Sequence, residues 1–225
     1  MKKVKYHLSF RFLEASAHFA NEALDYEKKE EKVNDYYNYI LPSGIISIVT
    51  FLEAYINEFY SEIVGNEIHM LNPVMVNYKS KIIDLCKKDN SQTKRLSTIN
   101  KYDKFLETVE VNKLDKSNYP IQDVIALIKL RNSLIHYEPI WQNVYDNDKE
   151  SNLKKLLNKR YNLCPYYDKN EEPFFPYLCL SSDCLNWAIK SSIALVNNFH
   201  NKLENFVPSI ETFKRTLEKL KINTA

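Results

Sequence analysis

Three residues that can do chemistry together lie within six positions of one another, in a segment that is otherwise apolar. The segment reads LIKLRNSLIHYEP over residues 127–139, and the three residues are Arg131, Asn132 and His136. Their guanidinium, amide and imidazole groups each lose free energy when they are buried without a partner. They are therefore solvated, paired inside a core, or retained for a reaction.

The spacing of these residues along a helix permits a reactive cluster without requiring one. Asn132 and His136 are four positions apart and share a helix face, whereas Arg131 lies about 140° from His136 around the axis. An imidazole can take or give a proton near pH 7, an arginine fork can bind a phosphate and stabilise its charge, and an amide can orient either group. The set suits cleavage of a phosphodiester. It needs no metal when the 2′-hydroxyl of RNA is the nucleophile.

The composition excludes several nucleotide-binding classes. The 225 residues include only two glycines, Gly44 and Gly65, and phosphate loops and dinucleotide fingerprints need several closely spaced glycines. The net charge of +2 gives no overall electrostatic signature for nucleic acid. Residues 79–104 carry eight basic residues and three Asp, a local charge of +5. Such a run either steers a polyanion or forms a solvated helix face.

The four cysteines predict free thiols rather than a metal site. They form no CxxC pair and have no histidine close to them in the sequence (Cys86, Cys164, Cys179 and Cys184). Zinc sites usually show closer pairing. We therefore expect no metal and no cofactor, and buried or half-buried thiols in a reducing compartment.

The hydrophobic periodicity predicts an all-α protein, a bundle of about seven or eight helices in one domain over residues 1–225. Pro42 suits the first position of an apolar helix that Gly65 would close. Ser181 or Asp183 should cap a long helix near the C-terminus. The expected helices cover residues 8–32, 43–64, 74–88, 92–109, from Pro120 to just before Pro139, 149–160, from the 181–183 cap to about 206, and a charged segment from 208 onwards, with an irregular stretch over 162–183.

The sequence gives no sign of a membrane or secretion signal. No apolar run approaches the roughly 18–20 residues of a membrane span. The N-terminus begins basic, but His7, Arg11 and Glu14 interrupt the apolar segment that a signal peptide needs. We expect a soluble cytoplasmic protein without a membrane partner.

The stretch RNSLIH, residues 131–136, resembles the R-x4-H motif of the HEPN superfamily, in which a polar residue follows the arginine. Many HEPN proteins are metal-independent endoribonucleases of toxin–antitoxin modules, phage defence and RNA processing. The resemblance implies that Arg131, Asn132 and His136 are catalytic and that the products carry 2′,3′-cyclic phosphate ends. It also implies a homodimer with a composite active site, an RNA substrate such as tRNA, and an antitoxin or defence-system partner.

Two further stretches resemble helices of such proteins, so the resemblance covers about residues 8–206. They are FLEAYINEFY over 51–60 and SSDCLNWAIKSSIALVNNFH over 181–200. Glu53 and Asn57, a polar pair on the first of these, either support the site or form hydrogen bonds between helices. A contact between Glu53 and Arg131 would neutralise and orient the arginine. Tyr137 is either a supporting site residue or a packing aromatic.

A second function of a different class fits the same residues. The chain would then be a non-catalytic HEPN-like module that binds a protein partner or a nucleotide, with the Arg and His as structural polar groups. The two readings differ in what they expect of His136 and Arg131. An enzyme should expose them in a cleft close to the motif of a second copy, whereas a binding module should satisfy them internally.

Overall fold

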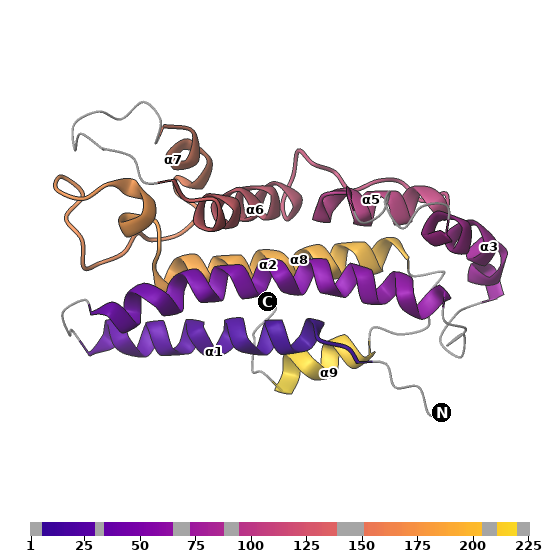
Figure 1. The fold of residues 1–225 in the computed structure, drawn as a ribbon, viewed down its shortest axis with the longest axis horizontal. Helices are drawn as coiled ribbons and strands as arrows, with labels where there is room; N and C mark the ends of the chain where they lie inside the picture. Colours follow the sequence, from indigo (N-terminus) through magenta and orange to yellow (C-terminus); the bar gives the residue numbers. More distant parts are fainter. Residues whose placement is uncertain are drawn as a thin grey trace.

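The chain folds into helices, as the sequence predicts. The computed structural model describes residues 6–29, 34–64, 73–87, 95–138, 151–203 and 211–219, and it contains no strand within these ranges. The elements are α1 (Ser9–Lys28), α2 (Asp35–Val64), α3 (Pro73–Lys87), α5 (Thr98–Thr108), α6 (Ile121–Ile135), α7 (Ser151–Leu157), the π-helical turn η2 (Phe174–Leu178), α8 (Ser182–Lys202) and α9 (Glu211–Lys219), shown in Figure 1.

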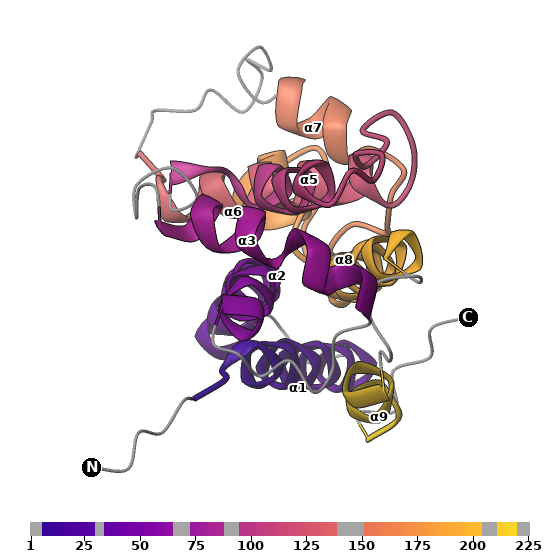
Figure 2. The same cartoon turned by 90° about the vertical axis from the view of Figure 1, so that its right-hand side faces the viewer.

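Helix α2 is the centre of the bundle. It packs most extensively against α1 and also contacts α8, α6, α5 and α3. Seen along the bundle, α1 and α9 lie on one side of α2, and α3, α5 and α6 lie on the other (Figure 2). One face of α2 is buried at helical spacing, including Ile45, Ile48, Leu52 and Ile56. The apolar residues whose spacing predicts this helix are therefore the residues that it buries.

Gly44 allows α2 and α8 to approach closely. A Cβ atom at this position would lie 2.4 Å from Cδ2 of Leu185, which is fully buried. On the α1 side, the hydroxyl of Ser16 donates to the carbonyl oxygen of Gly44 over 3.1 Å. Glycine is needed here for space rather than for its backbone freedom.

The prediction that α2 begins at Pro42 is wrong. The helix begins at Asp35, and Pro42 lies inside it. An internal proline costs about 3 kcal/mol, but Tyr37 and Leu41 continue the buried face and offset that cost. The side chain of Asn34 accepts a hydrogen bond from the N–H of Tyr37 over 3.1 Å, which caps the true start. Gly65, the expected closing residue, lies outside the described residues.

Helix α2 also corrects the expectation that no segment could span a membrane. Among the described helices, it is the one that is long and apolar enough, with a mean hydropathy of 1.6 over its best 18 residues. The sequence-based expectation failed because it sought an unbroken apolar run, whereas Ser, Thr and Gly interrupt this one. Half of that window is buried inside the bundle, as in the core helix of a soluble protein.

Several other boundaries are close to their predicted positions. Ser181 is the N-cap of α8, with its Oγ accepting from the N–H of Cys184 over 3.0 Å. The stretch expected to be irregular contains the turn η2. Helix α6 ends at Ile135, not just before Pro139, because His136 leaves helical geometry with φ −112° and ψ 36°.

Candidate active site at the end of helix α6

Helix α6 is anchored at its first turn by a polar network. Nε1 of Trp187 in α8 donates to Oδ2 of Asp123 over 2.6 Å, and Arg160 forms an ion pair with the other carboxylate oxygen. Asp123 is also favoured here because it lies at the positive end of the helix dipole. Beyond this turn, Val124, Leu127 and other residues bury the inner face of the helix. Contacts with α8 and with the residues after α7 therefore fix the orientation of α6, including its last turn.

Arg131 continues the buried face of α6. It follows Leu127 by four positions and Val124 by seven, and both of these are fully buried. Arg131 is half-buried, and its Nε atom is buried without a hydrogen-bond partner. No ion pair joins its guanidinium to any residue that the structure describes. A buried donor without a partner is costly, so this Nε lowers the stability of the fold.

Asn132 and His136 lie on the exposed side of the same helix end. Both side chains are exposed, and the N–H of His136 donates to the carbonyl of Asn132 over 3.0 Å, which closes the last turn. Among the described residues, no hydrogen bond or ion pair connects their side chains to Arg131. One chain thus presents an accessible imidazole and a guanidinium on different faces of one helix end, as the angular spacing predicts.

Apolar side chains flank His136 on both sides. Ile135 is 44% exposed and Tyr137 is 51% exposed. The ring of Tyr137 contacts Phe175 of η2, with 6.1 Å between ring centroids. Tyr137 is therefore a rim aromatic that joins the end of α6 to η2.

Glu53 pairs with Lys101 instead of Arg131. Its Oε1 lies 2.8 Å from Nζ of Lys101, which is only 3% exposed. Lys101 belongs to α5. Helix α5 lies over one half of α2, and η2 lies near the opposite end of α2 (Figure 1). Asn57, one turn further along α2, is exposed. The structure therefore places Glu53 beside α5, where its carboxylate neutralises the buried ammonium of Lys101.

The basic run over residues 79–104 is largely committed to internal partners where the structure describes it. Lys81 pairs with Glu110, and Lys101 pairs with Glu53. Lys104 pairs with Glu107. These pairs reduce the positive charge available to a polyanion, so they favour the interpretation of the run as an ordinary helix surface.

The cysteines are free thiols, as predicted. Cys164, Cys179 and Cys184 are buried, and Cys86 is half-buried. Burial raises the pKa of the Cys184 thiol to about 12, so it stays protonated and unreactive near neutral pH. A buried thiol of this kind packs as a small apolar side chain.

Sequence reasoning missed two polar pairs that join distant segments. Asp123 and Arg160 are 37 positions apart, so their ion pair produces no local pattern in the sequence. His200 had no sequence partner, yet its Nε2 lies 2.6 Å from the hydroxyl of Tyr55. Only the packing of α2 against α8 brings that pair together.

Comparison with protein-family models, with curated proteins and with solved structures found no match. The function is therefore argued from the chemistry of the site.

Proposed function

We propose that the chain is a metal-independent endoribonuclease of the HEPN type, with Arg131, Asn132 and His136 as its reacting set. The observation that supports this most is the buried, unpartnered Nε of Arg131, one turn from an exposed His136 on the same helix end. A guanidinium that forms no ion pair with any described residue is suited to an external anion, and the phosphodiester of RNA is such an anion.

In the proposed reaction, His136 takes the proton of the ribose 2′-hydroxyl. The 2′-oxygen then bonds to the phosphorus, and the bond between phosphorus and the 5′-oxygen breaks. The 5′-oxygen takes a proton from an imidazolium or from water. The products carry a 2′,3′-cyclic phosphate and a 5′-hydroxyl, and Arg131 stabilises the charge that builds on the phosphoryl oxygens. Asn132 orients the phosphate or the imidazole.

The working form would be a homodimer with a composite site. Within one chain, no described contact joins the half-buried Arg131 to the exposed His136, so a second copy related by a two-fold axis would complete the set. The exposed Ile135 and Tyr137 beside His136 give that interface apolar surface. The family resemblance adds a cytoplasmic toxin or anti-phage effector, acting on RNA such as tRNA and controlled by an antitoxin or defence-system partner.

The same exposed apolar rim also suits the alternative, a non-catalytic module that binds a protein partner. A direct assay separates the two. The purified protein would be incubated with total RNA and with tRNA in EDTA, beside Arg131→Ala and His136→Ala. Lys129→Ala, an exposed change on the same helix, is the matched control.

The nuclease reading expects cleavage by the wild type and by Lys129→Ala, and a loss of at least about 100-fold in the other two variants. Equal cleavage by all four proteins would place the activity outside this site. Binding to a protein partner by all four proteins, without RNA cleavage, would support the module.

A further inference from the structure

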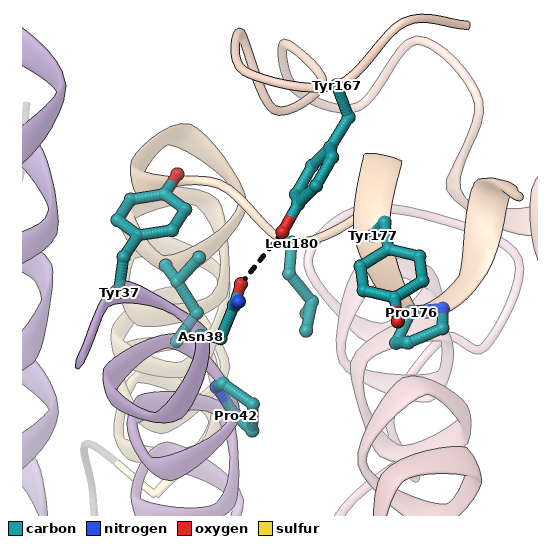
Figure 3. Close-up of a pocket in the computed structure, with 8 residues that line it drawn as sticks. Tyr37, Asn38, Pro42, Tyr167, Pro176, Tyr177 and Leu180 are labelled. Atoms are coloured by element: carbon teal, nitrogen blue, oxygen red, sulfur yellow. Dashed lines mark hydrogen bonds between the residues drawn. The ribbon is translucent and has the colours of Figure 1, made fainter. Parts of the chain in front are cut away.

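A pocket of about 290 Å³ lies between the start of α2 and the segment before α8. Figure 3 shows Tyr167 reaching Asn38, with Pro176 and Tyr177 on the opposite wall. The rings of Tyr167 and Tyr177 are in contact, with centroids 5.1 Å apart, and Tyr177 is 41% exposed. The remaining lining residues are Tyr37, Leu41, Pro42 and Leu180. The pocket thus has aromatic and aliphatic walls and an aromatic rim.

Asn38 provides the hydrogen-bonding groups of this pocket. Its Oδ1 accepts from the hydroxyl of Tyr167 over 3.0 Å, and its Nδ2 donates to no residue that the structure describes. Its main-chain carbonyl also lacks the usual helical donor, because residue 42 is a proline and has no N–H. Asn38 therefore offers the pocket an amide donor that has no partner among the described residues.

The lining selects a neutral, flat ligand. None of the lining residues carries a charge, so nothing there would hold a phosphate, a carboxylate or a metal ion. The volume is at the lower limit of small-molecule sites, so it suits one ring system. A ring with donors and acceptors on its edge and a π face for tyrosine has the chemistry of a nucleobase.

The pocket also adjoins the proposed active site. Tyr137 directly follows His136 and packs against Phe175. Pro176, which directly follows Phe175, lines the pocket. We infer that this pocket binds the base of one unpaired nucleotide of the RNA substrate, next to the phosphate that is cleaved. This inference rests on the proposed ribonuclease function, and it adds a specificity pocket to it.

Binding of uncharged ribonucleosides tests the pocket without any catalysis. The four ribonucleosides would be titrated one at a time into the wild type, Tyr177→Ala and Asn38→Leu, with ribose as the uncharged ligand without a base. Tyr39→Ala is the matched control, because Tyr39 is an exposed tyrosine of α2 outside the pocket. We expect the wild type and Tyr39→Ala to bind at least one nucleoside and Tyr177→Ala to bind it about tenfold more weakly. We expect Asn38→Leu to lose the preference for one base, and ribose not to bind.

The cleavage assay then separates the two proposals. Nucleoside binding that depends on Tyr177, without RNA cleavage, would keep the pocket and remove the ribonuclease. RNA cleavage that depends on Arg131 and His136 but is the same in Tyr177→Ala and Tyr39→Ala would keep the ribonuclease and overturn the pocket. Equal nucleoside binding by Tyr177→Ala and Tyr39→Ala would also overturn it.

Discussion

The buried imidazole of His200 should make the stability of the protein fall as the pH falls below neutrality. His200 is 5% exposed, and burial lowers its pKa to about 4 from the ordinary 6.5. Aromatic rings surround it, including Tyr55 and Phe213. The native state therefore keeps the imidazole neutral at pH values where the unfolded chain already protonates it.

The sign and size of the effect follow from proton linkage. Between pH 6.5 and 4 the unfolded state binds more protons than the native state, so the free energy of unfolding decreases as the pH decreases. The stabilisation is fully present above pH 6.5. With a pKa of about 4, the loss is about 2 kcal/mol at pH 5 and about 3 kcal/mol near pH 4. Most carboxylates are still ionised at pH 5, so the window from 7.5 to 5 reports mainly on the five histidines, and a variant of His200 separates its share.

Urea unfolding followed by circular dichroism at pH 7.5, 6.5, 5.5 and 5 measures this loss. The comparison is His200→Gln, which removes the titrating group but keeps a polar side chain near Tyr55. We expect the wild type to lose about 2 kcal/mol across the window and the variant to lose much less. A variant with the same slope as the wild type would refute the assignment of the acid sensitivity to His200.

Three other predictions concern the site and its support. Glu53→Ala should lower the free energy of unfolding by about 1–3 kcal/mol, because it leaves the buried ammonium of Lys101 unpaired. Asn57→Ala should change the free energy of unfolding by less than about 0.5 kcal/mol. If Glu53→Ala and Asn57→Ala had equal effects in chemical denaturation, this role for Glu53 would be contradicted. Arg131→Met should abolish cleavage yet leave the protein as stable as the wild type or about 1 kcal/mol more stable, since it removes an unpartnered buried donor; a large loss of stability would mean that the fold itself needs the guanidinium. Mixing Arg131→Ala with His136→Ala should restore about a quarter of wild-type activity if a two-fold dimer has two equivalent composite sites, because half of the dimers are mixed and each of these keeps one of its two sites intact. No recovery after confirmed subunit exchange would argue against a shared site.

Much of the fold was predictable because its signals are local. The apolar spacing along α2 and α8, the Ser181 cap and the low glycine content all act within a few positions of the chain. The passage of α2 through Pro42 was not predictable from those rules, because the burial of Tyr37 and Leu41 offsets a local penalty. Tertiary packing outweighs local propensity there.

The candidate site shows the same division. The spacing of Arg131 and His136 predicts that they lie on different faces of one helix; in the structure Arg131 is half-buried on α6, and His136 is exposed just beyond the end of that helix. The partner of Glu53 could not be predicted, because Lys101 meets it only through the packing of α5 on α2. The pocket around Asn38 also depends on residues about 130 positions away, of which Tyr167 is one. Pairings between distant segments leave no periodic signal in a single sequence.

The central claim is that His136 and Arg131 cleave RNA by activating its own 2′-hydroxyl. The most direct test uses an RNA that the wild-type protein cleaves in EDTA, with one 2′-deoxy substitution at the nucleotide 5′ to the cleaved bond. We expect cleavage of the unmodified RNA to give a 2′,3′-cyclic phosphate, and the substituted bond to remain intact while other sites are still cut. Cleavage at the deoxy-substituted position, or a product without the cyclic phosphate, would contradict the proposed mechanism.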